Sequence, residues 1–166
     1  MPRRRAILKI LLAAALTLAV APPAHAAEGA AATLMSLINA YRAASGRPAL
    51  AADDTLSAVA RRHGEDMARR AYFSHVTPEG GSLGDRLWNA GYTYAVAAEN
   101  LARGYRDAAA VLAGWQGSPD HLANLLRADV SRAGIGVVEP PPGAPTDGSR
   151  GPVWVLVLAA PRDAGR

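Results

Sequence analysis

The sequence predicts an α+β fold in which helices cover both faces of a central antiparallel sheet, an α/β/α sandwich. Apolar residues recur at helical spacing through most of residues 34–127, whereas β-rich runs come only near the end, at 134–139 and 153–160. The second run is apolar on both faces, as expected of a strand buried between two layers. Helices first and a doubly covered strand last favour two helical layers around one sheet.

Five helical segments are predicted, each behind a residue that commonly caps a helix. They are 34–44 after Thr33, 55–71 after Asp53 or Asp54, 83–90 after Ser82, 108–115 after Asp107 and 119–127 after Ser118. Residues 27–32 are expected to form a short flexible lead, and Gly46 to end the first helix. The stretch 92–104 shows no clear period. The segment 140–152, rich in Pro, Gly and Ser, is expected to join two antiparallel strands.

The first 26 residues have the organisation of a secretory signal peptide. Basic residues precede an apolar run at 10–21, and the small residues of 24–26 follow two prolines. The run is shorter than the roughly 20 residues that span a bilayer. We therefore expect cleavage after Ala26, a secreted or periplasmic location and no transmembrane segment in the mature form. The mature chain is predicted to be one domain, 27–166, with its core at about 34–160.

The formal charge of +4 comes entirely from the predicted signal peptide. Four of the 18 basic residues precede Ala27, whereas all 14 acidic residues follow it. The mature part therefore has equal numbers of both signs and lacks the basic patch of a nucleic-acid-binding protein. No nucleic-acid partner is expected.

The chain has no cysteine, so any metal site must use histidine and carboxylate ligands. His63 lies on the apolar face of its predicted helix, which indicates a hydrogen-bonded core histidine. His121 lies in the first turn of its helix, where the helix dipole favours neutral imidazole. His75 enters a glycine-rich turn.

Glu99 stands among small apolar residues, and burial of its carboxylate would need a cationic or metal partner. If Glu99, His75 and His121 converge, they form the two-histidine, one-carboxylate set of several catalytic zinc sites. Local sequence alone does not make these three residues neighbours.

A second interpretation involves Ser82, because residues 80–84 match the G-x-S-x-G pattern of serine hydrolases. That pattern needs a buried strand directly before it, and residues 76–79 indicate a turn instead. Ser82 also has a simpler role as a helix cap.

Taken together, the motifs resemble a bacterial member of the CAP superfamily (cysteine-rich secretory, antigen 5 and pathogenesis-related 1 proteins). The residues that carry the resemblance are Asn39, Arg42, Gly46, Leu50, 60–67, 73–75, Pro78, Gly80, Arg86, 91–92, 98–102, Trp115, 118–119, His121, Asn124, 134–136 and 154–155. Their order and spacing are specific, and they cover nearly the whole mature chain. The resemblance implies an α/β/α sandwich with a surface cleft.

The resemblance implies the composition of that cleft. Its residues would be His75, Ser82, Asp85, Glu99, His121 and Asn124. Ser82 stands about where the family has a second glutamate, with Asp85 nearby, and Asp120 replaces the glycine that usually precedes His121. Asp120 is expected to be exposed. The implied ligands for a divalent metal are His75, His121 and Glu99, with zinc the expected ion and copper a competitor.

Two function classes remain open. The first is a binding module whose His/Glu cleft takes a lipid, a glycan or a protein partner, with a weakly held divalent metal. The second is a metal-assisted, peptidase-like hydrolase that uses the same cleft and Glu99 as its candidate catalytic acid.

Overall fold

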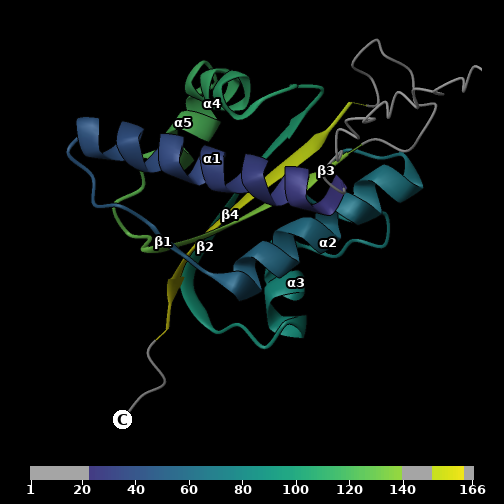
Figure 1. The fold of residues 1–166 in the computed structure, drawn as a ribbon. Coiled ribbons are helices and arrows are strands. Elements are labelled where there is room, and N and C mark those ends of the chain that lie inside the picture. The colour runs from purple at the N-terminus through teal and green to yellow at the C-terminus, as the bar shows by residue number, and fades with distance from the viewer. Residues whose placement is uncertain (1–22, 140–150, 163–166) are drawn as a thin grey trace, which may run out of the picture.

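The computed structural model describes residues 23–139 and 151–162 (Figure 1). Its elements, in chain order, are α1 Pro23–Ala44, β1 Ala51–Ala52, α2 Asp54–Arg70, α3 Leu83–Asn89, β2 Tyr94–Arg103, α4 Ala108–Gln116, α5 Pro119–Leu125, β3 Arg132–Val138 and β4 Val153–Pro161. Within these ranges, no helix has both the length and the apolar character needed to cross a membrane.

The strands form one sheet in the order β1-β3-β4-β2. β4 is antiparallel to both of its neighbours, with Val157 opposite Glu99 of β2 and Leu156 opposite Ile135 of β3. β1 contributes only two residues, which pair in parallel with the start of β3. The three long strands are therefore antiparallel, as predicted, and the short β1 makes the sheet mixed.

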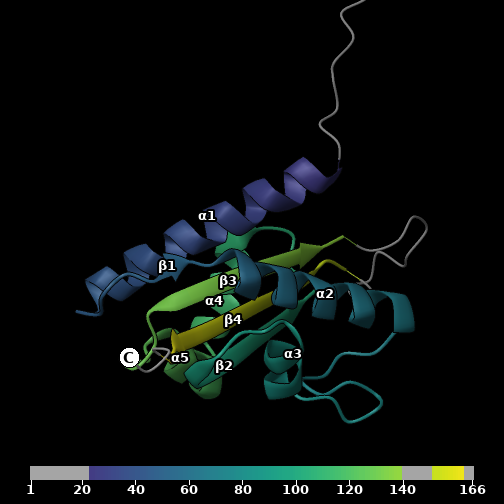
Figure 2. The same ribbon diagram turned by 90° about the horizontal axis from the view of Figure 1, so that it is seen from below.

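Helices cover both faces of the sheet, which confirms the predicted sandwich (Figures 1 and 2). α1, α4 and α5 lie on one face, and α2 and α3 on the other. The side chains of β4 alternate between two separate apolar cores. Trp154, Leu156 and Leu158 enter the core under α1 and α4, and Val153, Val155 and Val157 enter the core under α2.

α2 packs directly on the backbone of β3. A Cβ added to Gly134 would lie 2.6 Å from Cβ of Leu56, and one added to Gly136 would lie 2.6 Å from Cα of Arg61. Only glycine permits this approach, because real Cβ contacts are longer. The close packing therefore determines the distance between α2 and the sheet.

The first helix begins earlier than predicted. α1 already starts at Pro23, so the expected flexible lead at 27–32 is wrong, and Thr33 is not a cap. The Thr33 hydroxyl instead donates to the carbonyl of Gly29 within the helix, at 2.9 Å. The alanine-rich sequence around this point has high intrinsic helix propensity, which explains the extension.

Three other predicted caps are confirmed. Asp53 accepts from the N–H of Leu56, Asp107 accepts from Ala110, and Ser82 forms a capping box with Asp85 at the start of α3. Ser118 occupies the N-cap position of α5 without a side-chain hydrogen bond.

α5 ends at Leu125, earlier than the predicted residue 127. The guanidinium of buried Arg42 donates to the carbonyls of Leu125, at 2.7 Å, and Arg127, at 3.0 Å. Arg42 thus joins the end of α1 to the end of α5.

Candidate functional site

Glu99 is the centre of a polar cluster on β2. Its side chain is only 3% exposed, and each carboxylate oxygen has a partner. Oε1 lies 2.8 Å from Nδ1 of His75, and Oε2 accepts from Nη2 of Arg86 at 2.7 Å. Burial of a carboxylate is costly without such partners, so Arg86 and His75 together stabilise the charge of Glu99.

Arg86 supplies the cation that Glu99 requires. It lies on α3, its side chain is 13% exposed, and its Nη1 also donates to the carbonyl of His75 at 3.0 Å. The guanidinium therefore connects the buried carboxylate with the loop that carries His75. No role in the site was predicted for Arg86 from the sequence. The signal that could have found it was the requirement of Glu99 for a cation.

His75 is the exposed member of the cluster, with 53% of its side chain accessible. Because Nδ1 is bound to Glu99, Nε2 is the ring nitrogen left for a ligand. His63 contacts this loop, since its Nε2 lies 2.9 Å from the carbonyl oxygen of Ser74. A carbonyl only accepts, so Nε2 of His63 carries the proton.

His63 is a buried core histidine, as predicted. Burial lowers its pKa, and the nearby charge of Arg86 lowers this pKa further. His63 is therefore neutral near pH 7 and stabilises the packed interior.

His121 approaches the cluster from α5. Its carbonyl accepts from Nδ2 of Asn100 at 3.0 Å. Asn124 completes the link, donating to Oδ1 of Asn100 at 2.9 Å and to the carbonyl of Glu99 at 3.3 Å. These amides hold α5 against β2 beside Glu99.

The imidazole of His121 is partly buried, and that burial lowers its pKa. The neighbouring His75 lowers this pKa further, whereas Asp120 raises it. The lowered pKa keeps His121 neutral at pH 7. Asp120 itself is exposed, as expected.

Ser82 and Asp85 lie on the surface and bind each other. The Ser82 hydroxyl donates to Oδ2 of Asp85 at 2.6 Å, and this bond lowers the pKa of Asp85. Within the described chain, neither side chain has a hydrogen bond to His75, His121 or Glu99. No strand of the described residues directly precedes Ser82, so the serine-hydrolase interpretation lacks its structural context.

The arrangement does not fit the predicted three-ligand metal site. Both oxygens of Glu99 are already engaged, one of them by the positive charge of Arg86. Across residues 23–139 and 151–162, no three His, Asp or Glu side chains are placed to hold one ion. Zinc sites need at least three protein ligands in most catalytic examples. The site therefore offers two imidazoles rather than a closed coordination set.

Comparison with curated proteins finds two relatives from Bacillus subtilis (strain 168). The uncharacterized protein YkwD is 36% identical over 106 residues, which cover 64% of this chain and 41% of YkwD. The uncharacterized membrane protein YlbC is 38% identical over 104 residues, which cover 63% of this chain and 30% of YlbC. The chain thus spans less than half the length of these relatives.

Solved structures share the fold. An extracellular protein containing an SCP domain from Bacillus anthracis str. Ames matches with a TM-score of 0.72 and 30% identity, over 81% of this chain and 41% of that one. An outer surface protein from Borrelia burgdorferi matches with a TM-score of 0.70 and 21% identity, over 79% of this chain and 92% of that one.

The model of the cysteine-rich secretory protein family (CAP) matches residues 35–156. That range includes β1 to β3, the second half of α1 and the first residues of β4, and with them every residue of the cluster around Glu99. The chain belongs to the CAP family.

Proposed function

We propose that the chain is an exported binding module whose polar cluster around Glu99 engages a ligand through His75 and His121. The observation that carries the proposal is the hydrogen bond between buried Glu99 and Nδ1 of His75, which orients an exposed imidazole. A group fixed in this way loses little conformational freedom on binding. Imidazole side chains form hydrogen bonds through their ring nitrogens, so they suit the polar groups of a lipid, a glycan or a protein.

Export rests on the signal-like sequence before Ala27 and on the similarity to an extracellular SCP-domain protein. Cleavage after Ala26 would remove only the first residues of α1 and would leave its buried residues Leu34 and Ile38 in place. The intact mass of the exported protein should begin at Ala27. A mature protein that retains Arg3 to Arg5 would contradict export by cleavage.

Three histidines remain after Ala26, and they provide an internal test of the polar cluster. NMR of the imidazole Cε1–H groups can follow titration with phosphatidylglycerol vesicles, chitooligosaccharides or unfolded casein. A ligand of the polar cluster should shift the signals of His75 and His121, while the signal of buried His63 stays in place. Binding should be lost in the double variant His75→Ala/His121→Ala. Binding that survives in this variant would place the ligand elsewhere.

The second candidate, a hydrolase, is favoured by one specific observation. Glu99 orients His75 in the way that the third group of a catalytic triad orients its general base. No nucleophilic side chain of the described residues contacts His75, so water would have to be the nucleophile. In Glu99→Gln, hydrolysis would be abolished while binding that does not need the charge would persist. A binding function without turnover in wild type is the outcome we expect.

A further inference from the structure

β3 has an open edge along most of its length. On one side it pairs with β4 from Arg132 to Val138, but on the other side β1 reaches only Arg132 and Ala133. The N–H of Asp53 donates to the carbonyl of Ala133 at 2.9 Å, so the main chain of Ala133 points toward this side. Alternate residues share one edge of a strand, and Ile135 and Val137 therefore direct their N–H and C=O groups the same way. In the described part of the chain, no strand pairs with them there.

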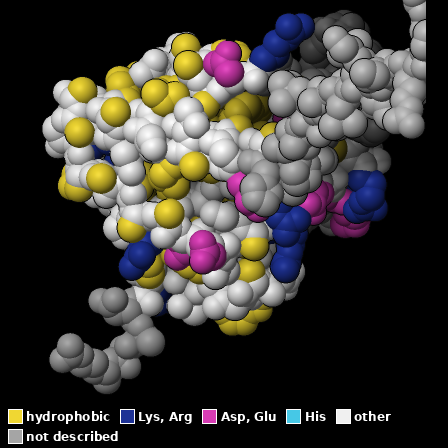
Figure 3. All heavy atoms as spheres, in the orientation of Figure 1, with side chains coloured by type: hydrophobic (Ala, Val, Ile, Leu, Met, Phe, Trp, Pro, Cys, Tyr) yellow, Lys and Arg dark blue, Asp and Glu magenta, His cyan; other side chains and the backbone are white. Residues whose placement is uncertain are grey.

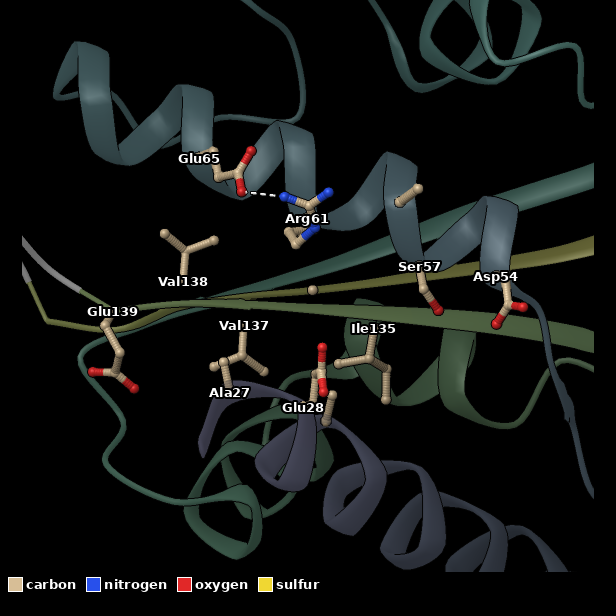
Figure 4. A pocket seen from close by; sticks show the side chains of 13 residues that line it. Ala27, Glu28, Asp54, Ser57, Arg61, Glu65, Ile135, Val137, Val138 and Glu139 are labelled. Atoms are coloured by element: carbon tan, nitrogen blue, oxygen red, sulfur yellow. Dashed lines mark hydrogen bonds and ion pairs between the residues drawn. The ribbon is translucent and has the colours of Figure 1, made fainter. Parts of the chain in front are cut away.

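A groove of about 690 Å³ lies against this open edge (Figure 4). α2 forms one wall and the first turns of α1 form the other, with β3 running between them. The apolar part of the lining is contributed by Ala27, Ala31, Ala58, Ile135, Val137 and Val138. The groove is thus bounded by apolar side chains and by unpaired main-chain groups, the two features that an added strand can use.

The rim of the groove is acidic. Four carboxylates line it, and the basic side chain in the lining, Arg61, is already paired with Glu65. The carboxylates are those of Glu28, Asp54, Glu65 and Glu139. Figure 3 shows acidic side chains, with basic side chains beside them, where the start of α1 meets α2. The local charge therefore attracts a cationic partner.

We propose that this edge is a docking site for an extended, basic segment of a partner polypeptide, which adds to β3 as a further strand. Main-chain hydrogen bonds to Ile135 and Val137 would supply affinity, and the acidic rim would select basic side chains. The site is independent of the polar cluster around Glu99, because Glu99 lies on β2, the strand at the opposite edge of the sheet.

A second copy of the chain is a poorer occupant. Antiparallel pairing of two β3 edges would bring two acidic rims together, and like charges across an interface oppose association. Charge complementarity therefore favours a basic peptide over self-pairing.

The probe is a fluorescein-labelled octapeptide of alternating lysine and valine, titrated with the exported protein and followed by anisotropy. Two matched peptides separate the contributions: one is N-methylated at alternate residues, and the other has glutamate in place of lysine. Each loss of a main-chain hydrogen bond weakens binding several-fold, so we expect the N-methylated peptide to bind at least about tenfold more weakly. The glutamate peptide should not bind measurably.

Variants of the protein then locate the site. Glu139→Lys reverses one exposed charge on the rim, and Asp129→Lys makes the same change on an exposed residue that is not part of the groove lining. The first should weaken peptide binding about tenfold and the second should leave it unchanged; circular dichroism confirms that both variants fold. Equal binding of the N-methylated peptide, no effect of Glu139→Lys, no binding at all, or a dimer that excludes the peptide would each overturn the proposal.

Discussion

The guanidinium of Arg103 stacks on the ring of Phe73, with its central carbon 4.6 Å from the ring centroid. The same guanidinium donates to the carbonyl of Tyr72. Arg103 ends β2, and Phe73 lies two residues before His75. This contact therefore joins the strand of Glu99 to the loop of His75 at a second point.

Phe73→Leu should weaken this contact between β2 and the loop of His75. Cation–π contacts at partly exposed positions contribute about 1 kcal/mol, so we expect a loss of about 1 kcal/mol in the free energy of unfolding. Urea denaturation measures the change. Trp88→Leu is the control, because Trp88 is 77% exposed on α3 and should change stability by less than about 0.5 kcal/mol. Equal effects of the two variants would show that the stacking has no specific role.

Glu99→Gln should destabilise the protein as well as alter the polar cluster. The change leaves the guanidinium of Arg86 buried without a counter-ion, and loss of one partner of a buried pair costs about 3 kcal/mol. Glu65→Gln is the matched control, because the exposed pair of Glu65 with Arg61 is worth less than about 1 kcal/mol. If both variants unfold at the same urea concentration, the Arg86–Glu99 pair does not stabilise the fold.

His63 should make stability fall in mild acid. Its pKa in the folded protein is lowered, so the unfolded chain binds the proton more tightly. Its contribution is therefore complete above about pH 6.5, the usual imidazole value, and is lost as the pH falls toward the lowered pKa of the folded state. Urea unfolding at about pH 7.5 and about pH 5.5, on either side of that usual value, measures this loss.

His63→Gln keeps a hydrogen-bond donor but does not titrate, so its stability should depend less on pH than that of wild type. His63→Ala should lower the melting temperature, because it removes a buried side chain, and should leave any metal affinity unchanged. An unchanged pH slope in His63→Gln would assign the acid sensitivity to another group, with His121 the first to examine.

Gly136→Ala should separate α2 from β3. The added methyl group would lie within 2.6 Å of the backbone of α2, and overpacking of this kind costs about 3 kcal/mol. Gly29→Ala makes the same chemical change in α1, where nothing lies within 4 Å of the new Cβ. Replacement of a helical glycine there should stabilise the protein by about 1 kcal/mol. Thermal unfolding of the two variants should therefore shift in opposite directions.

Zinc titration of the purified protein tests the predicted metal. With Glu99 held by Arg86, we expect at most the weak binding that two imidazoles provide, and its loss in His121→Ala. Binding should also fall in acid, because protonated histidine does not ligate a metal. Equal zinc binding by wild type and His121→Ala, or zinc binding by neither protein, would show that the site does not bind the metal.

Local signals in the sequence were sufficient for the caps and the alternating strand of β4. Asp53, Asp107 and the Ser82–Asp85 box each act within three residues, so the chain itself determines them. β2 was not predicted, because polar Glu99 and Asn100 interrupt its apolar pattern. These are the residues that the site uses, and functional sites are where local rules commonly fail.

The partnership of Arg86 with Glu99 could not be predicted from spacing. The two residues lie on a helix and a strand that only the folded sheet brings together. The sequence indicated that a buried Glu99 needs a cation. It did not indicate whether that cation is an arginine or a metal ion. The structure distinguishes them through the distance of 2.7 Å between Nη2 and Oε2.

The order of the strands has a consequence for when the sheet can form. β4 is the last of the described strands in the sequence, yet it occupies the interior of the sheet, and among those strands it alone pairs with β2. Until it arrives, β3 can pair only with the two residues of β1, so most long-range pairing must wait. A chain that crosses a membrane through a narrow pore would therefore remain unfolded until residues 153–161 have passed through the pore. The sandwich would then close in one late step, outside the compartment where synthesis began.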